Sequence, residues 1–180
     1  MRIRMSVICF VLASLVRVAA AEAQPAPACR FPELERLNSY AGVWDVRLES
    51  RLAAAGPWES TTGVADVSAE LSGCVSIERL RTTRQGRSME AITVLTWDHQ
   101  TSRWQATWTD SEHGMQLLYE GVANGDVLDL RLTRQVGNRA LTLRRVFRFS
   151  GPDQFSTESA RLTEAGAWDV TGRAQYSKRR

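Results

Sequence analysis

The chain has 180 residues, of which 43% are hydrophobic and 24% are charged, a composition typical of a single globular domain. Its 23 lysines and arginines outnumber its 20 acidic residues only slightly and are spread along its length. A nucleic-acid surface needs a concentrated basic face, so we expect no nucleic acid among the partners. The basic cluster Lys178-Arg179-Arg180 is predicted to be a solvated tail.

The first 23 residues have the pattern of a secretory signal peptide. Arg2 and Arg4 give a positive start, an apolar run extends from Met5 to Val16, and small residues end at Ala21-Glu22-Ala23. A transmembrane helix needs ~20 apolar residues, so this run is too short, and no second such run follows. We therefore predict a signal peptide over residues 1–23, one domain over residues 24–180, no membrane span, and a periplasmic or extracellular location.

Removal of this segment would change the charge and the cysteine count. The segment holds three arginines and one glutamate, so the net charge would fall from +3 to about +1. Cys9 would also be lost, which leaves Cys29 and Cys74. An even pair in an oxidising compartment favours one disulfide, with two free buried thiols as the alternative. Closing a loop of roughly 45 residues would stabilise the fold by up to about 4 kcal/mol.

A short helix is predicted near the start of the domain, over Pro32–Leu37. Proline suits the first helical position, and acidic residues occupy the first turn. Leu34, Leu37 and Tyr40 fall on one face, so the helix can cover an apolar opening. Gly42 then ends it.

After Gly42 the hydrophobic period changes from 3.6 to 2. Leu128, Leu130 and Leu132, for example, alternate with charged neighbours, as in a half-buried strand. Turn residues separate such segments, and Asn124-Gly125 is the clearest hairpin signal. The predicted strands are residues 43–53, 58–69, 74–84, 87–98, 103–110, 114–122, 126–135, 139–149, 154–162 and 167–177.

Short connections between consecutive strands favour an antiparallel meander, which removes its exposed edges by closing into a barrel. We therefore predict an all-β fold: an antiparallel up-and-down barrel of about eight to ten strands with a short N-terminal helix. A two-sheet sandwich is the alternative. A barrel of this size encloses a small cavity as well as a core.

Gly42-Val43-Trp44, directly after the predicted helix, resembles the Gly-x-Trp signature of lipocalins and their calycin relatives. A longer series resembles a bacterial family of lipocalin-like barrels, many of them exported and without an assigned function. The series comprises Tyr40–Val46, Leu71–Cys74 with Glu78, Trp104–Asp110, and a closing Trp168 with Tyr176. The resemblance covers residues 29–177 and implies that the two cysteines are paired. Lipocalins also place a basic residue across the signature tryptophan, and Arg173 does not fit this role because it falls on the polar phase of its strand.

Large rings are concentrated on one predicted wall of the barrel. Trp104 and Trp108 share a strand face with Asp110, while Trp97 and Tyr119 lie on single faces of the two flanking strands. These rings are either ordinary core packing or a flat cavity wall suited to an aromatic or acyl ligand.

Two charged residues interrupt the apolar phase. Asp110 follows the tryptophans on their own face, and Arg145 is in phase with Leu143 and Phe147. An interior charge costs on the order of several kcal/mol unless it is paired. Three explanations stay open: a bulge that flips the register, a structural pair, or a site for a ligand headgroup. In the last case Arg145 would favour a carboxylate.

Signals of catalysis are few. His99 and His113 are the only histidines, and both lie at or next to predicted turns. They are too few for a typical metal site, and no histidine in the last three strands offers an axial haem ligand. Glycine-rich phosphate or dinucleotide loops and a Gly-x-Ser-x-Gly elbow are not present. We expect no metal and no cofactor.

The leading interpretation is a non-catalytic protein that binds a small apolar or amphipathic molecule in the barrel cavity. The predicted ligand-binding residues are Trp97, Trp104, Trp108, Asp110, Tyr119 and Arg145. One alternative is an enzyme that acts on a small lipid-like substrate there, with Asp110, His113 or Arg145 in the cavity. Another is a structural or interaction domain with a filled interior. The Ala53–Pro57 connection is too short for a helical lid, so we expect a mouth that is open or covered by loops.

Overall fold

A computed structural model describes residues 29, 31–51, 55–84 and 86–180. The predicted signal peptide, residues 1–23, lies outside the described residues, and so does Ala53 of the first hairpin connection. Among the helices of the described part, none is long and apolar enough to cross a membrane.

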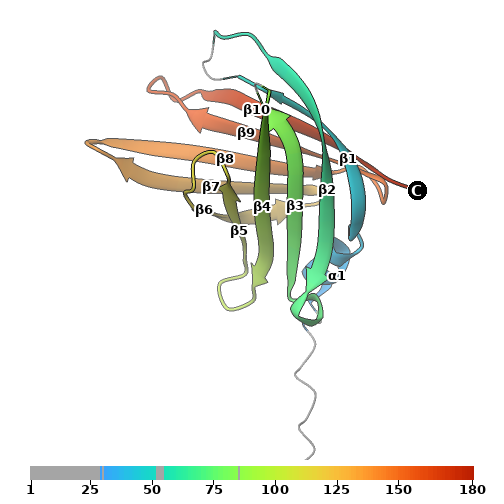
Figure 1. Cartoon of the computed structure of the whole chain (residues 1–180). Coiled ribbons are helices and arrows are strands. Elements are labelled where there is room, and N and C mark those ends of the chain that lie inside the picture. Colours follow the sequence, from blue (N-terminus) through green and yellow to red (C-terminus); the bar gives the residue numbers. More distant parts are fainter. Residues whose placement is uncertain (1–28, 30, 52–54, 85) are drawn as a thin grey trace, which may run out of the picture.

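The described chain forms one short helix, one single-turn 3-10 helix and ten strands. In order these are α1 (Pro32–Asn38), β1 (Gly42–Ser50), β2 (Glu59–Glu70), η1 (Leu71–Gly73), β3 (Val75–Arg84), β4 (Arg87–Asp98), β5 (Arg103–Asp110), β6 (Leu117–Asn124), β7 (Val127–Val136), β8 (Arg139–Phe149), β9 (Gln154–Leu162) and β10 (Trp168–Lys178). Each strand pairs antiparallel with its sequence neighbours, and β1 pairs with β10, so the sheet closes into a barrel (Figure 1). The predicted all-β barrel with a short N-terminal helix is confirmed, and the sandwich alternative is wrong.

The ladders preserve the alternation that the sequence shows. On β1, Trp44 and Val46 are buried in the interior, while Asp45 and Arg47, which alternate with them, are exposed. The register is continuous through the described ladders except for a shift in the β9–β10 pair, between Val170 and Gly172. Alternate residues along almost every strand therefore face the interior and the exterior of the barrel.

Helix α1 lies across one end of the barrel (Figure 1), where it contacts η1 and strands β3 and β4. Its apolar face buries Leu34 and Leu37 against the interior, in one core with Trp104 and Leu128. This is the opening that the helix was predicted to cover. We call this half of the barrel the closed half.

The disulfide between Cys29 and Cys74 is present, with the two Cα atoms 4.9 Å apart. It joins the segment before α1 to the residue that follows η1. The Asn38 side-chain amide also donates to the Gly73 carbonyl at 3.0 Å. The predicted pairing is confirmed, and it fastens the helix side of the barrel to the β2–β3 connection.

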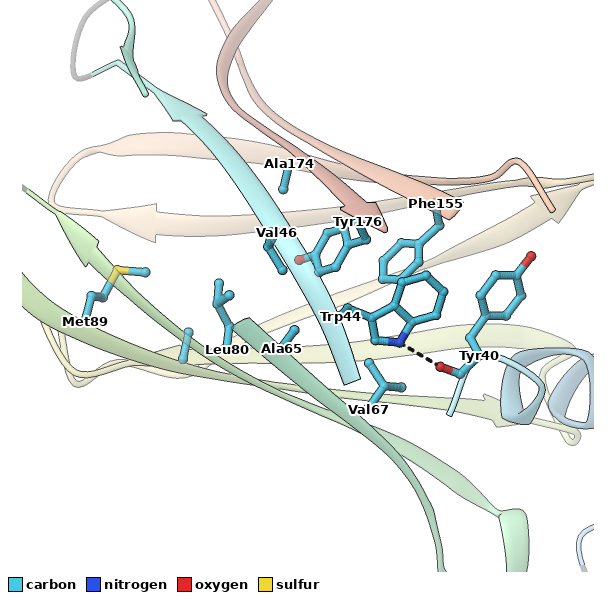
Figure 2. Close-up of a cluster of buried hydrophobic side chains, with 11 residues drawn as sticks. Tyr40, Trp44, Val46, Ala65, Val67, Leu80, Met89, Phe155, Ala174 and Tyr176 are labelled. Carbon is cyan, nitrogen blue, oxygen red and sulfur yellow. Dashed lines mark hydrogen bonds between the residues drawn. The ribbon is translucent and has the colours of Figure 1, made fainter. Parts of the chain in front are cut away.

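The Gly-x-Trp segment forms the centre of the closed half. The Trp44 ring is fully buried, and its indole N–H donates to the Tyr40 carbonyl at 3.0 Å. Figure 2 shows this bond and the neighbouring Phe155 ring, whose centroid is 4.9 Å from that of Trp44. Gly42 has φ +141°, and a Cβ atom there would meet the Lys178 side chain at 2.9 Å, so a glycine is required.

Lys178 supplies the basic residue that the lipocalin resemblance implies. Its ammonium nitrogen lies 5.4 Å from the centroid of the Trp44 ring. The next residue, Arg179, continues the β1 pairing through its backbone N–H to the Val43 carbonyl and binds the Asp45 carboxylate at 2.7 Å. The prediction of a solvated tail is therefore wrong for Lys178, which belongs to β10, whereas Arg179 and Arg180 are exposed as predicted.

Candidate functional site

A cavity of about 270 Å³ occupies the end of the barrel opposite α1. Its wall comes from the ends of β1, β3 and β5 and the starts of β2, β4, β6 and β10, together with inward positions of β8 and β9. We call this the open half. A second hollow runs over the outer surface of β10, β1, β2 and β3, but no aromatic side chain lines its described wall. The interior cavity is the better candidate for a ligand site.

The apolar part of this cavity follows from the strand register. Trp108 and Leu117 are direct partners across the β5–β6 ladder, and Tyr119 is one inward position further along β6. Leu80 and Met89, on β3 and β4, add aliphatic surface on the adjacent wall. An inward-facing aromatic and aliphatic wall of this kind suits an apolar molecule.

Arg145 is the most unusual residue of the cavity. It points inward from β8 with only 6% of its surface exposed, and its guanidinium carbon lies 4.2 Å from the centroid of the Trp108 ring. Its buried Nε has no hydrogen-bond partner within the described structure. The ladders on both sides keep their register through Arg145, so the explanation by a bulge is wrong.

The explanation by a structural pair also fails for Arg145. Of the ion pairs found between described residues, none includes it. Its role in binding a ligand headgroup stays a prediction.

Asp110, by contrast, is a paired carboxylate at the end of β5. It accepts hydrogen bonds from the Trp108 indole N–H at 3.1 Å and from the backbone N–H groups of Glu112 and His113 at 3.0 and 2.8 Å. The His113 ring nitrogen Nδ1 lies 3.0 Å from the same carboxylate. Burial acts to raise the pKa of Asp110, but the hydrogen bonds from His113 and Trp108 outweigh it and hold this pKa below its usual value.

The same contacts explain one difference from the predicted strand boundaries. The Asp110 carboxylate caps the turn that follows β5, and Gly114 in this turn has φ +60°. Strand β6 consequently begins at Leu117, three residues later than predicted, and Met115 is exposed before it. The Asp110–His113 pair lies at this turn, and the His113 side chain is 54% exposed.

Two of the predicted ligand-binding residues lie in the closed half. Trp104 is buried in the core under α1, and the Trp97 ring packs edge-on against it with centroids 5.5 Å apart. The 270 Å³ cavity is lined by Trp108, Asp110, Tyr119 and Arg145 but not by Trp97 or Trp104. The structure therefore brings four of the six residues together.

A buried polar cluster escaped the sequence analysis. Glu78 on β3 accepts hydrogen bonds from the Tyr176 hydroxyl at 2.6 Å and from the Thr93 hydroxyl at 2.7 Å. Burial, followed by the charge of Glu78, raises the pKa of Tyr176 well above its usual value. Glu78 shares a face of β3 with the buried Leu80, which could have indicated that it points inward. The polar residues Ser76 and Thr82 lie on the same face, so the sequence does not identify that face as the interior one.

Tyr176 marks the boundary between the two halves. Its ring stacks on Phe155 in the closed half, with centroids 4.0 Å apart (Figure 2), and the same side chain lines the cavity of the open half. In the part of the chain that the structure describes, no three His, Cys, Asp or Glu side chains are grouped as a metal site.

Comparisons with known proteins agree with this architecture. A family model described as "Protein of unknown function (DUF1579)" matches residues 31–178. A search of curated proteins finds no match. The crystal structure of Rv2717c from M. tuberculosis is similar, with a TM-score of 0.59 and 15% identity over 83% of this chain and 99% of that chain. The S-type phycobiliprotein lyase CPES from Guillardia theta is similar with a TM-score of 0.51 and 14% identity over 84% and 94% of the two chains. At such identities these likenesses show a shared barrel fold.

Proposed function

The chain belongs to the DUF1579 family, whose function is unknown, and we propose from the site itself that it binds a small apolar or amphipathic molecule in the open half of the barrel. The observation that carries this proposal is the cavity of about 270 Å³ between inward-facing rings, at the end that α1 does not cover. The proposed contacts are Trp108, Asp110, Tyr119 and Arg145.

The size of the cavity limits the ligand. Ligand pockets usually measure about 300–1,000 Å³, so this cavity lies just below the usual range. At ~30 Å³ per water molecule, 270 Å³ is room for about nine waters. A ligand with one or two aromatic rings or a short acyl chain fits this space, whereas a long-chain lipid exceeds it.

A neutral fluorescent probe tests this proposal directly. 6-Acetyl-2-(dimethylamino)naphthalene, a neutral molecule with two fused rings, emits in the blue only when it leaves water, so we expect blue emission to rise on addition of the protein. Ala174→Trp should abolish this rise, because Ala174 is buried on the cavity wall and a large ring there fills the space. The matched control is Gln175→Trp, the next residue on β10, which is exposed and should leave binding unchanged. Absence of binding by the wild-type protein would contradict the proposal.

We further propose that the protein is exported, because the first 23 residues have the signal-peptide pattern and the Cys29–Cys74 disulfide suits an oxidising compartment. Intact-mass measurement of the protein from the periplasm or medium of an expressing bacterium should give a chain that begins at Gln24 and lacks two hydrogens. A full-length, reduced chain confined to the cytoplasm would contradict it.

A further inference from the structure

Four arginines line the cavity, and Arg145 is the one for which the described residues supply no acidic partner. Three other arginines line the cavity, and we call them the rim arginines: Arg51, Arg84 and Arg173. Each has an acidic partner, respectively Asp169 at 2.8 Å, Glu112 at 2.9 Å and Glu158 at 3.8 Å. Arg145 is more deeply buried than these and has none within the described residues, although a buried charge needs a partner most.

The neighbours of Arg145 do not replace a counterion. The Trp108 and Phe147 rings lie 4.2 and 5.4 Å from the guanidinium carbon and offer cation–π attraction, but a ring is not an acceptor in the guanidinium plane, and the described residues give the buried Nε none. Glu78, the buried carboxylate of the closed half, uses both of its oxygens to accept from Tyr176 and Thr93. Arg145 therefore presents free donors to the cavity at its apolar inner wall.

A second polar group shares this wall. Tyr119 is buried and lines the cavity, and burial raises its pKa while the nearby positive charge of Arg145 acts in the opposite direction. Tyr119 is therefore a neutral phenol beside a guanidinium at ordinary pH. A planar guanidinium binds a carboxylate through two parallel N–H donors, and a phenol can add a third.

From this geometry we propose that the ligand is a small carboxylate whose head pairs with Arg145 and whose apolar body packs on the Trp108 ring. The inference rests on the proposed binding function and adds the charge of the ligand and its orientation. The carboxylate would lie inward, and the apolar body would extend toward Met89 and Leu117. A ligand of this kind supplies the partner that the buried guanidinium lacks.

Two probes of the same shape test the charge. 2-Naphthoate is an anion at neutral pH, and 2-naphthamide is its neutral counterpart; binding of both is followed by quenching of tryptophan fluorescence. We expect wild-type protein to bind 2-naphthoate at least about tenfold more tightly, the effect of one charge-assisted hydrogen-bonded pair. Arg145→Gln should remove the preference and leave 2-naphthamide binding within about twofold.

The control is Arg148→Gln, because Arg148 is on the same strand as Arg145 but is exposed on the outer face. It should keep the full preference for 2-naphthoate. Arg145→Lys, which retains the charge without the planar fork, should keep an intermediate preference, and circular dichroism establishes that each variant is folded.

The outcomes separate the two proposals. Equal binding of the two probes by the wild-type protein overturns the carboxylate inference and leaves the cavity as a binding site for neutral molecules. A full preference for 2-naphthoate that survives in Arg145→Gln overturns the role of Arg145. Failure of both naphthyl probes and of the neutral fluorescent probe overturns the binding function itself.

Discussion

Glu78 in the closed half and Arg145 in the open half are both buried charged side chains, but their surroundings differ. In the closed half, Glu78 accepts a hydrogen bond at each of its carboxylate oxygens. In the open half, Arg145 faces a cavity, and its buried Nε has no acceptor within the described residues. Buried polar groups in proteins are normally satisfied, so a satisfied one indicates a structural role. A buried polar group that lacks a partner and lies beside an internal space indicates instead that a bound molecule supplies the partner.

The comparison first predicts where stability is concentrated. Trp44→Ala removes a fully buried ring from the closed half, and we expect the free energy of unfolding to fall by about 3–5 kcal/mol. Trp108→Ala removes a half-buried ring that already borders a cavity, so the expected loss is only about 1–2 kcal/mol. Urea unfolding followed by circular dichroism measures both. Equal losses would show that the open half is packed as tightly as the closed half.

The disulfide gives the next largest effect on the closed half. Cys29→Ser with Cys74→Ser releases a loop of roughly 45 residues, for which chain entropy predicts a loss of up to about 4 kcal/mol, and measured losses are commonly about 2–4. Thermal unfolding of this variant against wild type under oxidising conditions measures it. Because the bridge lies on the α1 side, probe binding in the open half should persist at temperatures where both proteins are folded. Loss of probe binding from the folded variant would show that the halves are coupled.

Replacing Glu78 and replacing Arg145 should have different effects on the free energy of unfolding. Glu78→Leu leaves the hydroxyls of Tyr176 and Thr93 without their acceptor, so we expect a loss of about 2–3 kcal/mol. Arg145→Leu removes an unpaired buried cation, so the ligand-free protein should be unchanged or more stable by about 1 kcal/mol. Urea unfolding of the ligand-free proteins compares them. Strong destabilisation by Arg145→Leu would mean that Arg145 has a structural role.

The stability of the protein at alkaline pH tests the buried pair of Tyr176 and Glu78. Its pKa is raised in the folded protein, so the folded state holds the phenolic proton more tightly than the unfolded state does. The resulting stabilisation is complete below the unfolded pKa of about 10 and is lost as the pH rises from there through the folded pKa. Stability of the wild type should therefore fall more steeply above pH ~10 than that of Tyr176→Phe. If the stability of both proteins fell equally with pH, Tyr176 would not be the source of the alkaline destabilisation.

The fold was predictable because it depends on local patterns. The period-two alternation and the turn residues predict all ten strands, and the helix over Pro32–Leu37 is found at Pro32–Asn38. The start of β6 was predicted three residues too early because the cap formed by the Asp110 carboxylate depends on a side-chain conformation that alternation does not encode.

The site was predictable only in part, for a geometric reason. Alternation tells whether a side chain points inward, but it does not give depth along the barrel axis. Trp104 and Trp108 share an inward face of β5, yet the first packs under α1 and the second lines the cavity. The surroundings of each ring depend on which end of the barrel α1 covers, and that depends on contacts between residues far apart in the sequence. Lys178 was missed for the same reason, since its place over Trp44 depends on how β10 pairs with β1.

The smallest expected effect concerns Asp110, a partly buried carboxylate that lines the cavity and already has hydrogen-bond partners. Its pKa is lowered in the folded state, so its contribution to stability is present above the unfolded pKa of about 3.9 and is lost as the pH falls through the folded value. Asp110→Asn should cost no more than about 1 kcal/mol at pH 7. The stability difference from wild type should shrink below pH ~4, because wild-type Asp110 is then also uncharged.

Probe binding distinguishes the roles of Asp110 and Arg145. Asp110 lines the cavity, but its carboxylate already accepts hydrogen bonds from Trp108, Glu112 and His113, so we expect it to contact the ligand by packing alone. Asp110→Asn should therefore leave the preference for 2-naphthoate within about twofold. Arg145→Gln should abolish that preference. If Asp110→Asn strengthened 2-naphthoate binding more than tenfold, Asp110 would oppose the anion directly, and its carboxylate would have to face the ligand rather than the turn that it caps.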